Sequence, residues 1–186
     1  MNSSQEIENR LNQVKRLISE KNNSEIKLNA NGGNSILLVC PPNQEIEYIE
    51  TAKKILGNEE CVFVDINKLL IEFLDQYKEE IEQKFKLLQS SIQQIFKNSE
   101  NSNENDFYKY ILEEIKRILN ESKIPVIYSV GTLNGTKIEN IHIIENKTVM
   151  KAKLPIIILY PATQIDDKLL FLNSRPSSKY RCMIIE

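Results

Sequence analysis

Short, continuously apolar runs alternate along this chain with longer stretches in which apolar residues recur every three or four positions. The runs are rich in β-branched and aliphatic residues, and Gly, Pro or Asn bound them. That combination is typical of strands buried on both faces. The pattern predicts four such strands, at Ser35–Cys40, Cys61–Asp65, Pro125–Val130 and Pro155–Tyr160.

The stretches between these runs have the 3.6-residue periodicity of amphipathic helices. Asn43 is placed to cap the helix that follows the first strand. The longest stretch allows a break near Tyr77, and the polar segment after it predicts a loop at 98–105. The predicted helices cover 4–21, 44–56, 68–97, 106–121 and 136–145.

Strands that alternate with helices predict an α/β fold of three layers, in which a mostly parallel sheet of about four strands has helices on both faces. Two later apolar segments, Leu169–Leu172 and Tyr180–Ile185, predict a small C-terminal antiparallel β pair. We therefore divide the chain into an N-terminal helix with an Asn/Gly-rich linker, residues 1–34, and a single α/β domain, residues 35–186.

Charge and apolar content narrow the range of partners and cellular locations that the sequence favours. The 186 residues include 24 basic and 26 acidic side chains, for a net charge of −2. This balance does not favour a nucleic acid or an anionic membrane as the partner. Apolar runs reach only about six residues, whereas a membrane span needs roughly 20. No signal-peptide pattern opens the chain, so we expect a cytoplasmic protein.

Few residues have the chemistry of a catalytic or metal site. Cys40, Cys61 and Cys182 lie in or beside apolar runs at wide spacing, which indicates buried free thiols. His142 is the only histidine, and its isoleucine-rich helix favours a structural role. We therefore expect no catalytic residues, no metal and no cofactor.

The turn after the first strand argues against a nucleotide site. Ligands of wound α/β sheets bind beyond the carboxyl ends of the strands, where a phosphate needs bare backbone N–H groups. Here Pro41 and Pro42 remove two donors, and Asn43 follows them. Glu45 and Glu47 then place negative charge where a phosphate would bind.

The remaining strand ends define a crevice that could hold a smaller ligand. Asp65 could act as an acid, although helix capping is the favoured explanation. The loop that begins at Gly131 could bind an anion or could simply turn the chain. The candidate ligand-binding residues are Pro41, Pro42, Asn43, Asp65, Gly131, Thr132, Pro161 and Thr163.

Two surfaces are candidates for binding a partner. Near the C-terminus, Arg175, Lys179, Tyr180 and Arg181 form a basic and aromatic cluster that could contact an acidic protein or, less favourably, nucleic acid. The Lys- and Glu-rich faces of the two longest helices are either solvated or bound to a partner, and the sequence leaves both open.

Several segments together resemble a known family. They are Leu37–Glu45, Val62–Leu70, Leu154–Pro161, Leu169–Arg175 and Tyr180–Ile185. Their order of apolar strand, proline turn, leucine-rich strand and Tyr-bearing final strand is similar to that of the BrxB family of bacterial BREX phage-defence systems.

The resemblance implies a non-enzymatic component of a multi-protein defence complex. Such a component would act as an adaptor for a larger partner, such as the PglZ alkaline-phosphatase-like protein of BREX. A protein-binding adaptor is therefore our leading hypothesis. A small-ligand or nucleotide sensor or enzyme that uses the crevice is the first alternative, and a weak nucleic-acid-binding subunit is the second.

Overall fold

The computed structural model describes residues 3–19, 23–88, 92–98, 104–166, 168–177 and 180–186. Within these residues one sheet has seven strands. The α/β class and the mostly parallel sheet are confirmed, and the sheet is larger than the expected four strands. The strands are β1 (Ser35–Cys40), β2 (Cys61–Asp65), β3 (Ile124–Tyr128), β4 (Ile156–Ile165), β5 (Lys168–Phe171), β6 (Arg175–Pro176) and β7 (Met183–Ile185).

Five of the strands form a parallel array in the order β2-β3-β4-β1-β7. The centre of this array is the contact of β1 with β4, which runs in register from Ser35 opposite Ile156 to Cys40 opposite Pro161. The remaining strands are antiparallel: β5 pairs with the last residues of β4, and β6 pairs with β5.

The predicted end of the fourth strand at Tyr160 is wrong, because β4 continues to Ile165. A proline removes only its own N–H, and the Pro161 carbonyl still accepts a bond of 2.8 Å from the Leu172 N–H. Beyond Pro161 the strand leaves its parallel neighbours and forms a hairpin with β5, in which Ala162 pairs with Phe171.

The C-terminal antiparallel pair forms with different members from those predicted. The leucine-rich strand β5 pairs with β4 and with the short strand β6. The last strand, β7, instead lies parallel to β1, with Ile36 opposite Met183 and Leu38 opposite Ile185. It covers the edge of β1, whose N–H and C=O groups would otherwise be unpaired.

The main helices correspond to the predicted stretches, although the stretch 136–145 is helical only over Asn140–Ile144. The stretch 68–97 forms three helices, with the break at Tyr77. Two short helices, α2 and α9, and two 3₁₀ turns, η2 and η3, were not predicted. The elements are α1 (Ser3–Ile18), α2 (Asn23–Asn29), η2 (Pro42–Gln44), α3 (Glu45–Leu56), α4 (Ile66–Gln76), α5 (Lys78–Leu88), α6 (Gln93–Phe96), α7 (Phe107–Asn120), η3 (Val130–Leu133), α8 (Asn140–Ile144) and α9 (Lys147–Lys151).

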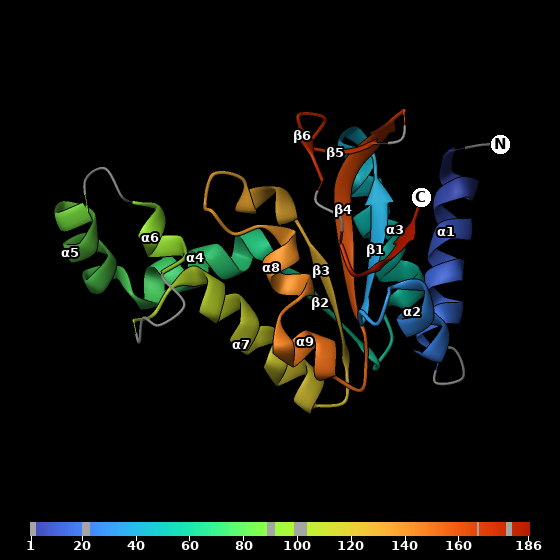
Figure 1. Cartoon of the computed structure of the whole chain (residues 1–186), viewed down its shortest axis with the longest axis horizontal. Coiled ribbons are helices and arrows are strands. Elements are labelled where there is room, and N and C mark those ends of the chain that lie inside the picture. Colours follow the sequence, from blue (N-terminus) through green and yellow to red (C-terminus); the bar gives the residue numbers. More distant parts are fainter. Residues whose placement is uncertain (1–2, 20–22, 89–91, 99–103, 167, 178–179) are drawn as a thin grey trace.

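The strands divide their side chains between two apolar clusters, one on each face of the sheet. In β1, Ile36, Leu38 and Cys40 join the cluster that includes residues of α1, α2 and α3. Leu37 and Val39 join the cluster that includes residues of α4, α7, α8 and α9. Figure 1 shows these two groups of helices on opposite sides of the sheet. The alternation follows from the two-residue repeat of a strand.

The N-terminal segment contributes directly to the core. Its helix α1 buries Ile7, Leu11, Val14 and Leu17 against α3 and the sheet. These positions lie three or four residues apart, so one face of α1 is apolar. Residues 3–18 therefore form part of the layer that covers one face of the sheet.

Asn34 holds the start of β1 to the segment before β4. Its side chain is buried, and its Nδ2 lies 3.2, 3.0 and 2.8 Å from the carbonyl oxygens of Val149, Ala152 and Leu154. These acceptors are more than 100 residues away along the chain. Asn34 therefore fixes the position of β1 relative to the end of α9.

Replacement of Asn34 by alanine leaves these buried carbonyls with fewer donors. We expect Asn34→Ala to lower the free energy of unfolding by about 1–3 kcal/mol, measured by urea denaturation. Asn29→Ala is the control, because the Asn29 side chain is exposed and donates only to the Glu25 carbonyl one helical turn earlier. Equal effects of the two substitutions would contradict the role given to Asn34.

Candidate functional site

The turn beyond β1 contains the residues on which the nucleotide argument depends. Pro42 begins the 3₁₀ turn η2, and the Gln44 N–H donates to the Pro41 carbonyl at 2.8 Å. Helix α3 then starts at Glu45, and no side chain caps it. The prediction that Asn43 caps this helix is wrong, because η2 places Asn43 before the N-cap position, which Gln44 occupies.

Glu45 is the charged group at this turn. Its carboxyl is half-buried, and its Oε1 has no hydrogen-bond partner in the described residues. Burial raises the pKa of this carboxyl, the backbone N–H of Ser129 opposes the shift, and the negative charge of Asp65 adds to it. The turn therefore places a carboxylate, at an energetic cost, where a phosphate-binding loop would place N–H groups.

Asp65 lies at the carboxyl end of β2 and caps α4. Its Oδ1 accepts a bond of 3.0 Å from the Asn67 N–H, which confirms the preferred capping role. The Asn67 side chain also contacts the hydroxyl of Thr132 in η3, and that hydroxyl lies 2.8 Å from the Ser129 carbonyl. Hydrogen bonds therefore link the ends of β2 and β3. In these bonds the polar groups of Asp65, Asn67 and Thr132 satisfy one another or nearby backbone groups.

The other crevice candidates have structural contacts. Gly131 lies within η3, where a Cβ would meet the Leu172 side chain at 3.5 Å. Pro161 is inside β4, opposite Cys40. The Thr163 hydroxyl donates to the side chain of Asn173 rather than facing the turn beyond β1.

A small enclosed pocket lies beside β4, β5 and β6. Two members of the predicted basic and aromatic cluster, Arg175 and Tyr180, line it. The Tyr180 hydroxyl is 3.0 Å from that of Tyr160, and burial together with this hydrogen bond raises the pKa of Tyr160. Arg175 pairs with Glu139 at 3.5 Å and donates to Asn134 at 3.2 Å.

This pocket is too small for a nucleotide. Its volume is about 70 Å³, whereas one water molecule in the liquid takes up about 30 Å³. Arg181 of the predicted cluster does not line this pocket. The Arg181 guanidinium instead lies 3.3–3.4 Å from the Asn31 carbonyl, and Lys179 falls outside the described residues.

The thiols and the histidine have structural roles. All three cysteines are free and buried. Burial raises the pKa of Cys61 to about 11 and that of Cys182 to about 12, and it also raises the pKa of Cys40. They are therefore protonated at neutral pH and poor nucleophiles. His142 Nδ1 accepts a bond of 2.9 Å from the Glu139 N–H at the start of α8, as a structural histidine would.

Metal clusters and membrane-spanning helices are both absent from the residues that the structure describes. Among them, no group of three or more His, Cys, Asp or Glu side chains is arranged to hold a metal ion. None of the helices in the described ranges combines the length and the apolar character that crossing a membrane requires.

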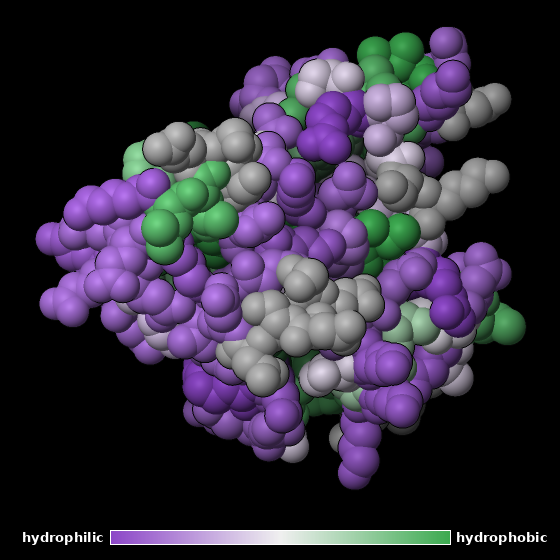
Figure 2. Space-filling view, turned by 60° about the vertical axis from the view of Figure 1, so that its left-hand side comes forward, coloured by the Kyte–Doolittle hydropathy of each residue, from purple (hydrophilic) through white to green (hydrophobic). Residues whose placement is uncertain are grey.

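A helical arm, which we define as residues 66–88 and 92–98, corresponds to the predicted helical stretch 68–97, whose Lys- and Glu-rich face the sequence left open as solvated or partner-binding. Figure 1 shows α5 and α6 at the far end of this arm from the sheet. Its base is buried through Leu69 and Phe73, whereas α5 has no buried residue. The arm exposes Ile71, Leu74, Phe85 and Leu87 by 60, 37, 56 and 82%. Figure 2, which turns this end forward, shows hydrophobic patches among mostly hydrophilic side chains.

Comparison with protein-family models, with curated proteins and with solved structures finds no match to this chain. The interpretation of these surfaces therefore depends on their geometry and chemistry.

The half-buried carboxyl of Glu45 predicts a pH-dependent stability. Because its pKa is raised in the folded protein, ionisation destabilises the fold as pH rises from about 4 through the raised value. We expect Glu45→Gln to raise the melting temperature at pH 7 and to have a smaller effect near pH 4. The control is Glu47→Gln, at an exposed position in the same turn of α3, which should leave the melting temperature unchanged at both pH values. A gain that is larger at pH 4 than at pH 7 would refute this account.

Proposed function

We propose that this protein is a non-enzymatic protein-binding component that docks a larger partner through the helical arm. The observation that supports this most is the exposure of Ile71, Leu74, Phe85 and Leu87 on helices that extend beyond the sheet. Full burial of one such side chain contributes roughly 1.5–3 kcal/mol. A partner that covers the arm would therefore gain a central apolar contact of the kind that dominates stable interfaces.

The base of the arm is ordered before any partner binds. Phe73 packs against Phe107 and Tyr110 of α7, with ring centroids 5.6 and 5.7 Å apart, and against Tyr77 at 5.3 Å. Farther along, Lys84 pairs with Glu80 and with Glu104 at 3.0 and 3.1 Å. An arm held in this way loses little conformational entropy on docking.

The crevice offers less support for an enzyme or a small-ligand sensor. Asp65, Asn67 and Thr132 bind one another or nearby backbone groups. The turn beyond β1 presents a carboxylate instead of phosphate-binding donors. An adaptor needs a stable scaffold and an exposed surface, and it needs no reactive group at this position.

The resemblance to the BrxB family supports the biological setting of the proposal. On that basis the complex is a cytoplasmic phage-defence assembly of the BREX type, and the partner is a PglZ-type alkaline-phosphatase-like protein.

A binding measurement with a defined partner tests the proposal. We expect the full chain to bind the PglZ-type protein from the same genome in a biosensor assay. The double substitution Phe85→Ser with Leu87→Ser should weaken binding by about tenfold or more, because it removes two apolar contacts. The matched control is Leu28→Ser with Ile46→Ser, which are 80 and 75% exposed but lie outside the arm.

Three results would contradict the proposal. One is the absence of binding by the unaltered chain, and another is equal weakening by the arm and control variants. The third is a dimer of the chain in light scattering that the arm variant abolishes, because a second copy would then cover the arm.

A further inference from the structure

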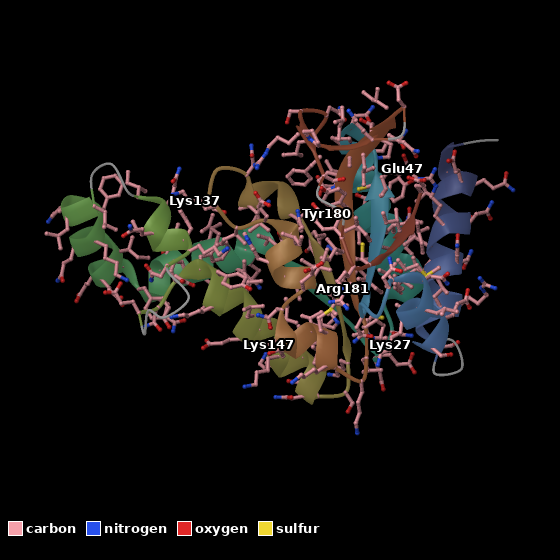
Figure 3. All side chains as sticks on the ribbon, in the orientation of Figure 1. Lys27, Glu47, Lys137, Lys147, Tyr180 and Arg181 are labelled. Atoms are coloured by element: carbon pink, nitrogen blue, oxygen red, sulfur yellow. The ribbon has the colours of Figure 1, made fainter. Side chains whose placement is uncertain are left out.

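A second surface, on the side of the sheet where α7, α8 and α9 pack, consists of two adjoining hollows. The first has a volume of about 670 Å³, and its lining includes Lys116, Lys151 and Lys153 but no Asp or Glu. The second, also about 670 Å³, includes Lys97, Lys109 and Lys147. Thr148 lines both hollows, so they adjoin, and we call the two together the lysine groove. Figure 3 shows Lys147 beside this part of the molecule.

The positive charge of the lysine groove is local. The whole chain has a net charge of −2. Among the described residues, six lysines line the groove, and the carboxylates that line it are Asp106 and Glu145. The Asp106 side chain is also occupied, because its two oxygens accept bonds of 2.7 and 2.8 Å from the Lys109 and Asn98 N–H groups.

Lys109 Nζ donates to the Glu104 carbonyl at 2.6 Å, and Lys97 Nζ lies 5.5 Å from the centroid of the Tyr108 ring. The other four lysines of the groove form no ion pair among the described residues, whereas some basic residues elsewhere do. Arg117, next along α7, pairs with Glu114 and Glu121, and Lys84 pairs with Glu80 and Glu104. In contrast, none of the ion pairs found among the described residues involves Lys116, Lys147, Lys151 or Lys153. Their charge is therefore available to an anionic ligand.

We propose that the lysine groove binds the phosphodiester backbone of single-stranded nucleic acid. Proteins that bind single strands combine a positive groove for the backbone with aromatic side chains near the bases. The second hollow contains Tyr108 and His142, whose ring centroids are 6.2 Å apart. The Tyr108 hydroxyl lies 2.8 Å from the His142 carbonyl, which fixes its ring. A single strand leaves its bases free to contact such rings, whereas a duplex keeps its bases stacked and paired.

This function is separate from docking through the arm. Most residues that line the lysine groove lie on α7, α8, α9 and the adjoining loops, and only Lys97 and Asn98, which follow α6, belong to the arm. The exposed apolar residues Ile71, Leu74, Phe85 and Leu87 lie on α4 and α5, away from these two residues in the chain. One chain could therefore hold a protein partner and a nucleic-acid strand at once. Each surface can be tested by substitutions that leave the other unchanged.

Salt-dependent binding of the full chain tests the proposal. The probe is a fluorescein-labelled oligothymidylate of about 20 nucleotides, titrated by anisotropy between about 50 and 200 mM NaCl. The variant Lys116→Gln, Lys151→Gln, Lys153→Gln should bind about tenfold more weakly. Its log–log salt dependence should be shallower by about 2, because each lost phosphate contact reduces the slope by about 0.7. The control replaces Lys15, Lys27 and Lys54, which are exposed and lie outside both the groove and the arm, by Gln and should bind within about twofold of the parent.

Each other outcome overturns the proposal. No binding at about 50 mM salt removes it, as does an equal loss in the two triple variants. Tighter binding of a duplex of the same length excludes a single-strand groove. Tighter binding of poly-glutamate than of the oligonucleotide would assign the lysines to an acidic protein instead.

Discussion

The complete burial of β1 is the constraint on which the rest of the structure depends. All six residues of Ser35–Cys40 are buried, and the strand pairs with β4 on one side and with β7 on the other. A strand in this position needs apolar side chains on both faces and a hydrogen-bonding partner along both edges. The helices α1 to α3, the helices α7 to α9 and the C-terminal strand β7 meet these needs.

Because β1 is completely buried, the residues at its two ends also differ in chemistry. At its start, Asn34 is buried and satisfies backbone carbonyls before β4. At its carboxyl end, Pro41 and Pro42 lead into a helix whose first residue, Glu45, has an incompletely solvated carboxylate. The end of the sheet that binds ligands in many α/β proteins is therefore occupied here by the protein's own polar groups.

Chemically distinct surfaces arise where helices extend past the sheet or border it. The arm passes beyond the sheet, so apolar residues such as Phe85 and Leu87 stay exposed among the residues that the structure describes. The lysine groove borders the sheet at α7 and α9. Lysines such as Lys116 and Lys151 line its first hollow, whose described lining residues include no Asp or Glu. The two proposals thus depend on different forces. One depends on apolar burial and the other on charge, so their responses to salt should differ.

The sequence by itself determined the four buried strands, the positions of the main helices, the break near Tyr77 and the capping role of Asp65. These features depend on side-chain periodicity and on residues close in the chain, which a linear pattern records. The tertiary structure alone decided the extension of β4 beyond Pro161, the pairing of β7 with β1, and which helical apolar residues stay exposed. It also decided that lysines from α7, α9 and their adjoining loops share one groove. These depend on contacts between residues far apart in the chain, where a free strand edge or the end of a sheet selects the partner, and no local pattern encodes that choice.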